Sequence, residues 1–432
     1  MRKKGIYATK VACGTALALS LASTFAFAGP QEQQMMMELK KLIEQQQTQL
    51  AKQAKEIEEL QKSIGGVHVA MEEKATKEEL KAIEETAGPN SYIKSKFENV
   101  DVSVYGQLNK AIMFADNGSS SKTYFVDNDN SSSRIGLTAK VGVSEDFSVG
   151  SKFEYEFQSN DSNLINEESD SVSANFNLRH ADMFFTSKTF GKVSLGKGSM
   201  AADGTSQSDL SGTSVVAYSS VSDMAGGQLW NEDNTGLSTL QVKDVFSDFD
   251  GGRDDRIRYD SPSYYGFNAA VAAATDDKYD LALRYSRDYD IAKVASAVAY
   301  QSLGNDSDID DIYNGSLSVL FNNGLNFTVA GGIQNSAHSS QDDGSFYGGK
   351  IGYQANIFQL GKTNFSIDYF RNEDVQEDGG DADSWAFAVV QNVPDWGTDF
   401  YCAFRQYMYD SDVAGSDYDD INVIMTGARL KF

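Results

Sequence analysis

Residues 146–158 read DFSVGSKFEYEFQ, a stretch in which apolar and polar side chains alternate. The apolar positions are Phe147, Val149, Phe153, Tyr155 and Phe157, and the polar positions opposite them are Lys152, Glu154, Glu156 and Gln158. A repeat of two residues is typical of a β-strand, because successive side chains point to opposite faces of the strand. Such a strand can separate a core from water, and it can equally separate lipid from a polar lumen.

The connections between such stretches differ in length in a regular way. Long acidic segments rich in Ser, Asn and Gly, such as QSNDSNLINEESDS and NEDVQEDGGDADS, alternate along the chain with short joins such as SED and NNG. This rhythm is typical of an up-and-down barrel in the outer membrane, with tight turns at one end and loops at the other. The sequence therefore predicts an all-β fold over residues 97–432, a transmembrane antiparallel β-barrel of about sixteen strands.

The composition narrows the classes of function. The chain has 432 residues, of which 41% are hydrophobic, and its 62 acidic against 37 basic residues give a net charge of -25. No basic patch is present, so we expect no nucleic-acid partner. After residue 28 no apolar run reaches the ~18 residues of a membrane helix, so membrane-spanning elements are expected to be strands.

The amino-terminal residues predict export, followed by a helical segment. Basic residues at positions 2–4, an apolar stretch and the small residues around position 28 are typical of a signal peptide over residues 1–28. Between residues 31 and 64 apolar side chains recur every seven positions, which favours a coiled coil. A lone amphipathic helix on a globular surface is the alternative. We expect a periplasmic coiled-coil segment over residues 29–96, with its seam at Met36, Ile43, Leu50, Ile57 and Ile64.

The chain ends on an alternating strand whose last residue is Phe432. Counting back by twos places Leu430 on the same face, while Lys431 lies on the other. In a closed barrel the last strand pairs with the first, which leaves no free edge. The ending resembles the C-terminal strand that outer-membrane proteins offer to the barrel-assembly machinery, with Phe432 and Leu430 as the signal.

Four segments resemble, in order, parts of the Gram-negative general porins: NSSSRIGLTAKVGV, FGKVSLGKG, DLSGTSVVAY and RIRYDSPSYYGF. The resemblance covers roughly residues 100–432 and implies a homotrimer in the lipid bilayer of the outer membrane. It also implies that the third loop folds into the barrel and narrows it, with acids on the loop facing basic residues of the wall. By position, the loop acids are Asp203 and Asp209, and the wall residues are Arg134, Arg179, Arg256 and Arg258.

Alternation supports this assignment for some of these residues. Arg134 is expected to point inward, because Ile135 and the apolar residues that alternate with it face the other way. If Arg179 points inward, strict alternation places His180 and Asp182 on the outer face. Further acidic residues on the lumen side are expected at Glu154, Glu156 and Asp368.

The expected function is passive diffusion of small hydrophilic solutes and ions through a water-filled channel. The acidic loops favour mild cation selectivity, because fixed negative charge concentrates cations at the mouth. Plain general porins lack the amino-terminal rod, whereas some substrate-selective porins resemble this chain in carrying a periplasmic coiled coil. Two alternatives therefore stay open: a substrate-selective porin for a small organic or anionic solute, and a tether from the outer membrane to peptidoglycan or another periplasmic partner.

The sequence offers little for catalysis. Its histidines, His68, His180 and His338, lie far apart in the chain without the spacing of metal ligands. A hydrolase would also need a serine and an orienting polar residue to converge on one of them. We therefore expect no enzymatic activity, no metal and no cofactor.

Overall fold

The computed structural model describes residues 100–432 apart from 233–234, 305–307, 339 and 413–415. The predicted signal peptide and the predicted coiled coil lie outside these residues and stay predictions. No helix in the described part of the chain is long and apolar enough to cross a membrane.

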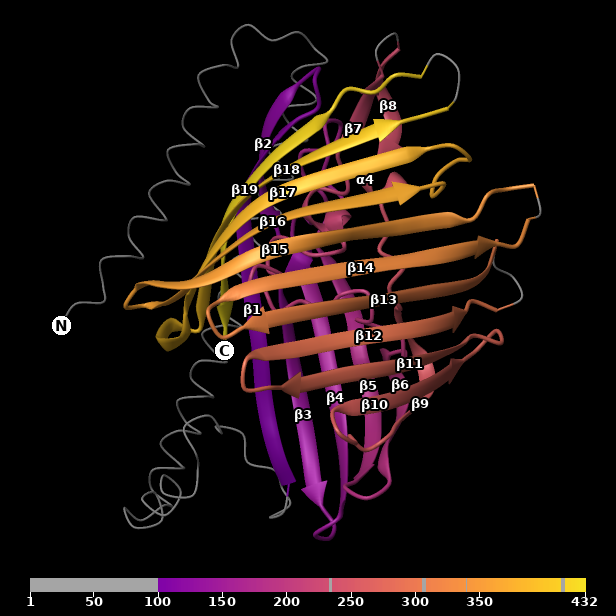
Figure 1. Cartoon of the computed structure of the whole chain (residues 1–432), viewed down its shortest axis with the longest axis vertical. Helices are drawn as coiled ribbons and strands as arrows, with labels where there is room; N and C mark the ends of the chain where they lie inside the picture. The colour runs from indigo at the N-terminus through magenta and orange to yellow at the C-terminus, as the bar shows by residue number, and fades with distance from the viewer. Residues whose placement is uncertain (1–99, 233–234, 305–307, 339, 413–415) are drawn as a thin grey trace, which may run out of the picture. The chain divides into compact units, whose positions relative to one another are not determined.

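Most described residues belong to one antiparallel sheet of 17 strands, shown in Figure 1. The strands of this sheet are β1 (Val100–Asp116), β2 (Ser121–Asp127), β3 (Arg134–Gly142), β4 (Phe147–Gln158), β5 (Asn175–Ser187), β6 (Gly191–Ser199), β9 (Arg253–Asp260), β10 (Phe267–Ala274), β11 (Tyr279–Asp288), β12 (Ala292–Ser302), β13 (Ile309–Phe321), β14 (Leu325–Ser336), β15 (Gly344–Phe358), β16 (Gly361–Glu373), β17 (Asp381–Val393), β18 (Thr398–Asp410) and β19 (Ile421–Lys431). Because β2 and β3 pair with successive parts of β1, they share one place in the sheet, which therefore has sixteen positions.

The sheet closes on itself through its first and last strands. β19 pairs antiparallel with β1, and Leu430 lies opposite Leu108. Beyond the last residue of β19, Gly106 N donates to Phe432 O at 2.9 Å and Phe432 N donates to Gly106 O at 3.0 Å. The prediction that the terminal strand completes a closed barrel is confirmed, and so is the predicted number of strands.

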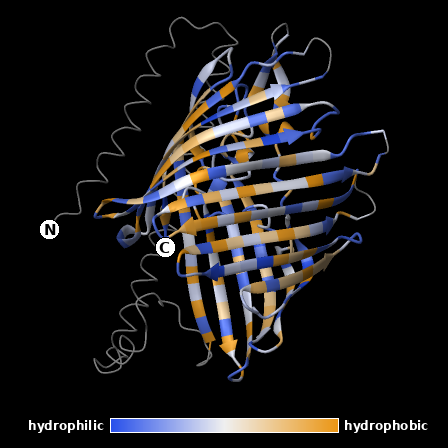
Figure 2. Ribbon diagram, viewed as in Figure 1, coloured by the Kyte–Doolittle hydropathy of each residue, from blue (hydrophilic) through white to orange (hydrophobic). Residues whose placement is uncertain are grey.

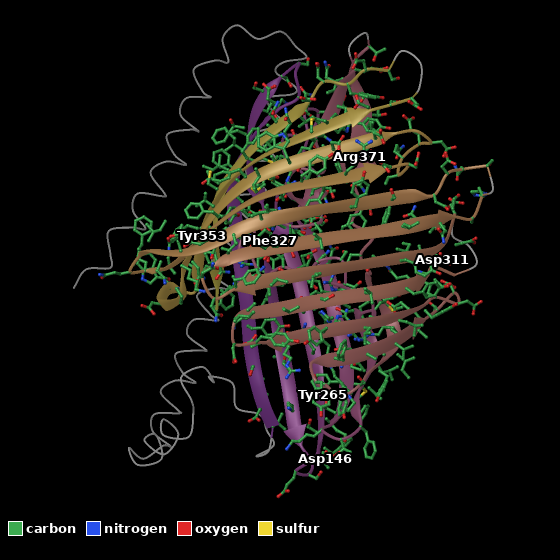
Figure 3. All side chains as sticks on the ribbon, viewed as in Figure 1. Asp146, Tyr265, Asp311, Phe327, Tyr353 and Arg371 are labelled. Carbon is green, nitrogen blue, oxygen red and sulfur yellow. The ribbon has the colours of Figure 1, made fainter. Side chains whose placement is uncertain are left out.

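The two ends of the barrel differ in the length of the connections between strands. Turns such as 143–146, 322–324 and 359–360 lie at one end, whereas the segments 159–174, 200–252 and 411–420 lie at the other. In Figure 3, Asp146 marks the turn end and Asp311 marks the loop end.

Apolar side chains cover the outer face of the strands. Figure 2 shows apolar and polar residues alternating along the ribbons. Phe327 and Tyr353, labelled in Figure 3, are 40% and 49% exposed although both lie within paired strands. Such exposure of large apolar side chains on a closed barrel fits a surface that contacts lipid.

The interior of the barrel is divided between an apolar and a polar part. Inward positions of β1, β18 and β19 carry fully buried Met113, Tyr407 and Met425, whereas their outward neighbour Ile424 is 45% exposed. These residues form one hydrophobic core with side chains of the segment 200–252, including Val216 and Trp230. The expectation of a polar lumen lining is therefore wrong for this part of the wall, because the segment 200–252 packs against it.

Candidate functional site

The segment 200–252, here called the inner loop, connects β6 to β9 and contains β7 (Leu229–Glu232), β8 (Gly236–Gln241) and the short helix α4 (Val242–Val245). Its first part runs along β13 and is held by side chains of that strand. Ser208 N and Leu210 N each donate at 2.9 Å to the hydroxyls of Ser316 and Ser318. Ser316 and Ser318 lie two residues apart, so their hydroxyls are on the same face of β13. Their spacing matches that of the amide groups of Ser208 and Leu210, which are also two residues apart.

Asp209 lies within this first part but does not face the predicted arginines. Its carboxylate accepts from Lys350 Nζ on β15 at 2.6 Å, and the two side chains are 5% and 1% exposed. The same ammonium donates to Ala217 O at 2.5 Å and to Thr213 Oγ1 at 3.3 Å. Asp209 therefore anchors the loop to the wall.

The base of the inner loop is held by a second set of contacts. Ala201 N and Ala202 N donate to the carboxylate of Asp280 on β11, at 3.0 and 2.7 Å. Asp203 forms an ion pair of 3.3 Å with Arg253 at the start of β9, and Arg253 is 30% exposed. Among the described residues, neither Asp203 nor Asp209 is ion-paired with the four predicted arginines.

On the opposite wall, a charged cluster occupies the inner face of β3, β4 and β5. Glu154 lies 2.9 Å from Arg179 Nε, 3.4 Å from Lys152 Nζ and 3.8 Å from Arg134 Nη1. Arg179 also pairs with Glu156. We call Arg134, Lys152, Arg179, Glu154 and Glu156 the wall cluster. It contains two of the predicted wall arginines and two of the predicted lumen acids.

A β-bulge explains why strict alternation misplaces part of β5. Glu154 pairs with His180 and Tyr155 pairs with Leu178, so Arg179 is the extra residue. The bulge lets Arg179 bond Glu154 while Asp182 also points inward, where it is 7% exposed. The expectation that an inward Arg179 places Asp182 on the outer face is wrong, because one added residue reverses the alternation that follows.

Asp182 holds Arg256, one of the predicted wall arginines. The two side chains form an ion pair of 2.6 Å and are 5% and 4% exposed. Arg256 also donates to Ser199 O at 3.0 Å and Gly196 O at 2.8 Å. The Arg256 side chain therefore points into the barrel, and groups of the barrel wall pair with it and accept its hydrogen bonds.

Arg258 lies two residues further on and is more accessible. It pairs with Asp260 at 2.6 Å, donates to Met200 O at 2.7 Å, and is 15% exposed. Arg258 thus contacts the base of the inner loop.

Asp368 is one of the acids that the sequence predicts in the lumen. It lies on β16 and forms an ion pair of 3.0 Å with Arg405 on β18, and the two side chains are 0% and 1% exposed. The residue points inward but is covered, because the inner loop fills this part of the barrel. It is thus a buried wall residue, in contrast to the partly exposed cations of the wall cluster.

Several acids of the inner loop lie in its interior. Burial raises the pKa of Asp223 above the ordinary value, and the charges of Asp129 and Asp248 add to the effect. Burial also raises the pKa of Asp248, although hydrogen bonds to its carboxylate oppose the shift. Burial and then the charge of Asp248 raise the pKa of Asp250 to about 7. Asp250 nevertheless accepts from Gly204 N at 2.6 Å and Ser206 N at 3.0 Å. These acids therefore stabilise the loop locally through hydrogen bonds and contribute little negative charge to the lumen.

Sequence reasoning missed three cations, Lys152, Lys350 and Arg253. Lys152 was visible on the polar face of β4, between carboxylates of the same face. Lys350 follows two glycines in FYGGKIGY. The residues before it therefore show no alternation of apolar and polar side chains that would predict which way the lysine points. The extent of the inner loop was also missed, although apolar residues on both faces of AIMFA (111–115) and INVIM (421–425) indicate strands buried on both sides.

A closed barrel with an apolar outer face, a charged wall and a loop folded inward defines a channel of the outer membrane. The family profile described as Gram-negative porin matches residues 86–412, and this chain belongs to that family. No curated protein sequence matches the chain.

Solved structures show the same fold. The anion-selective porin from Comamonas acidovorans has 14% identity and a TM-score of 0.53, over 77% of this chain and 100% of its own. OmpT, an outer membrane protein of Vibrio cholerae, has 15% identity and a TM-score of 0.50, over 79% of this chain and 100% of its own. A mutant of OmpT that lacks loop L8 has 14% identity and a TM-score of 0.51, over 78% of this chain and 100% of its own.

Proposed function

We propose that this porin is a diffusion channel for small hydrophilic solutes and ions, without enzymatic activity. The observation that carries the proposal is the unequal interior of the barrel. The inner loop packs on the wall of β13 to β19 through an apolar core, whereas the cations of the wall cluster are partly exposed on β3 to β5. Water and ions follow polar surfaces, so the path runs along the wall cluster.

The inner loop narrows this path. It carries its own hairpin, it shares a hydrophobic core with the barrel wall, and its backbone is bonded to β11 and β13 at several points. A loop held in this way reduces the cross-section permanently, unlike a flexible flap. Replacing residues 205–250 by a short Gly/Ser linker should increase the single-channel conductance several-fold, and an unchanged conductance would contradict the narrowing.

Ion preference depends on two regions of opposite charge, the acidic segments at the loop end and the cations of the wall cluster. The loop-end segments are rich in acids, as in NEDVQEDGGDADS, and attract cations at the mouth. This attraction is screened beyond about 8 Å at physiological salt. We infer mild cation selectivity at low salt that fades as salt rises. Reversal potentials in salt gradients test this, and anion selectivity at low salt would contradict it.

A second candidate function is a substrate-selective channel for an anionic solute. The exposed cations of the wall cluster favour it, and the similar porin from Comamonas acidovorans is described as anion-selective. Saturation of the flux by one solute would distinguish this candidate from a general diffusion channel.

We also propose a homotrimer whose amino-terminal segments associate through the predicted heptad seam. Replacing Ile43, Leu50 and Ile57 by Asp should weaken the trimer in sedimentation experiments, and a monomeric unmodified protein would contradict the proposal.

A tether to peptidoglycan or a periplasmic partner makes a different prediction. Deleting residues 31–90 would then reduce attachment of the envelope while permeability stays unchanged.

A further inference from the structure

A cavity of about 530 Å³ lies at the loop end of the barrel, beside the paired strands β9 to β12. Its lining includes Met200 and Gly252, one from each end of the inner loop, and Met200 N donates to Gly252 O at 3.0 Å. A cavity of this size is in the range of small-molecule sites, roughly 300–1,000 Å³. We call it the mouth pocket, and its described lining contains no residue of the wall cluster.

One side of the mouth pocket is fixed by contacts with the base of the inner loop. The buried strand residues Asp280 and Gln301 both line the pocket. Asp280 accepts from the amides of Ala201 and Ala202, and Gln301 Nε2 donates to Phe249 O at 2.9 Å. These bonds hold both ends of the loop, so this side of the pocket is preformed. They also occupy the carboxylate of Asp280.

Another side of the mouth pocket is the tight turn between β10 and β11. Asp276 and Asp277 have φ values of 62° and 58°, and Ala274 N donates to Lys278 O at 2.9 Å. Two successive residues with positive φ are typical of the type I′ turn, whose twist matches that of paired strands. The turn therefore holds Asp276 and Lys278 at defined positions beside the pocket.

Two side chains of opposite charge lie next to each other in the lining. Lys278 Nζ is 3.4 Å from Asp254 Oδ2, and the two side chains are 39% and 28% exposed. A partly exposed pair at this distance is weakly held, so both groups can pair with a ligand. Asp276 adds an exposed carboxylate. Arg253 also lines the pocket, but its guanidinium pairs with Asp203.

This arrangement of charges selects among small solutes. A carboxylate is attracted by Lys278 and repelled by Asp254, and the reverse holds for an amine. An α-amino acid carries its ammonium and its carboxylate on the same carbon, so it can pair with both groups at once. Met200 and Leu303 add apolar surface to the same lining.

We propose that the mouth pocket binds α-amino acids with an apolar side chain as they enter the channel. The ammonium pairs with Asp254, the carboxylate pairs with Lys278, and the side chain contacts Met200 and Leu303. This inference rests on the proposed function and names one class of its solutes.

Ligand-observed NMR with the purified full-length protein in detergent tests the mouth pocket. Saturation transfer to leucine should reach a plateau as its concentration increases. Isoamylamine and isocaproate share the apolar part of leucine, but each carries only one of its two charges. Both should bind at least about fivefold more weakly than leucine, because each pairs with one charged group and is repelled by the other.

Variants of the two charged groups separate recognition from a general loss of structure. Lys278→Gln and Asp254→Asn should each raise the half-saturating concentration of leucine by about threefold or more, the loss expected for one charge-assisted contact. Lys278→Gln should also remove the advantage of leucine over isoamylamine, and Asp254→Asn its advantage over isocaproate. If Asp254→Asn lacks the electrophoretic mobility of the folded barrel, Lys278→Gln in the turn decides alone.

Asp288→Asn and Lys293→Gln are the matched controls. These residues form an ion pair of 3.3 Å between β11 and β12 at the turn end, and their side chains are 72% and 56% exposed. Neither change should alter the binding of leucine. Equal half-saturating concentrations in pocket and control variants, or a single-charge probe that binds as tightly as leucine, overturn the inference. A folded protein that inserts into a bilayer but passes no current overturns the proposed function instead, whatever the binding measurement shows.

Discussion

Asp209 in the inner loop and Lys350 on β15 form an ion pair of 2.6 Å that is almost completely covered. They lie 141 residues apart in the sequence, so the pair fixes the loop to a distant strand. A covered pair of this kind stabilises one arrangement of the loop, because loss of either partner leaves a buried charge uncompensated.

Asp209→Asn should destabilise the packing of the loop by about 3–5 kcal/mol, the usual cost of breaking a buried pair. We expect a lower midpoint of thermal unfolding in detergent and noisier single-channel current. The double variant Asp209→Leu with Lys350→Met should recover part of the stability, because it leaves no unpaired charge. A change in ion selectivity without loss of stability would instead mean that Asp209 faces the lumen.

Trp230 tests the hydrophobic core inside the barrel. Its side chain is fully buried and packs against Tyr409 and Tyr418, with ring centroids 5.9 and 6.4 Å away. Trp230→Ala should cost about 3–5 kcal/mol of loop stability, as for other buried aromatic side chains. Limited proteolysis should then cut the inner loop faster. The matched control is Trp396→Ala, since Trp396 is 58% exposed and its removal should not affect cleavage of the loop.

The raised pKa of Asp250 predicts a dependence of stability on pH. Its ordinary value is 3.8, and burial together with Asp248 raises it to about 7 in the folded protein. Between about pH 4 and 7 the folded loop therefore binds a proton that the unfolded chain has released, so this group makes stability fall as pH rises. Asp250→Asn should reduce the difference between the unfolding midpoints at pH 5 and pH 8. An identical difference in variant and parent would contradict the assignment.

Phe432 is predicted to matter for assembly. It is 60% exposed, although its backbone is bonded to Gly106. Because an exposed terminal aromatic buries little area in the folded barrel, we expect its role to be recognition by the assembly machinery. Deleting Phe432 should lower the amount of protein in the outer membrane, while the remaining channels conduct normally. Unchanged abundance would argue against this role.

The barrel could be predicted from the sequence because its outer face obeys a simple rule. Residues such as Phe153 and Ile257 face outward at every second position, so alternation is preserved even where strand boundaries are uncertain. Pairing of the last strand with the first follows from closure, which needs no knowledge of the side chains.

The interior could be predicted only in part. Arg134, Glu154 and Glu156 follow from alternation and lie together, as described above. Arg179 joins them through a bulge, and a single sequence gives no sign of where a bulge falls. The partner of Asp209 could not be predicted either, since Lys350 is brought to it by the fold of the inner loop.

The most direct test of whether water and ions pass through the barrel is a single-channel recording of the purified protein in a planar bilayer at low and high salt. An open path beside the inner loop should give discrete steps of ohmic current, with a weak preference for cations at low salt that disappears at high salt. Insertion of the folded barrel without any conductance would contradict the central claim that water and ions pass beside the inner loop.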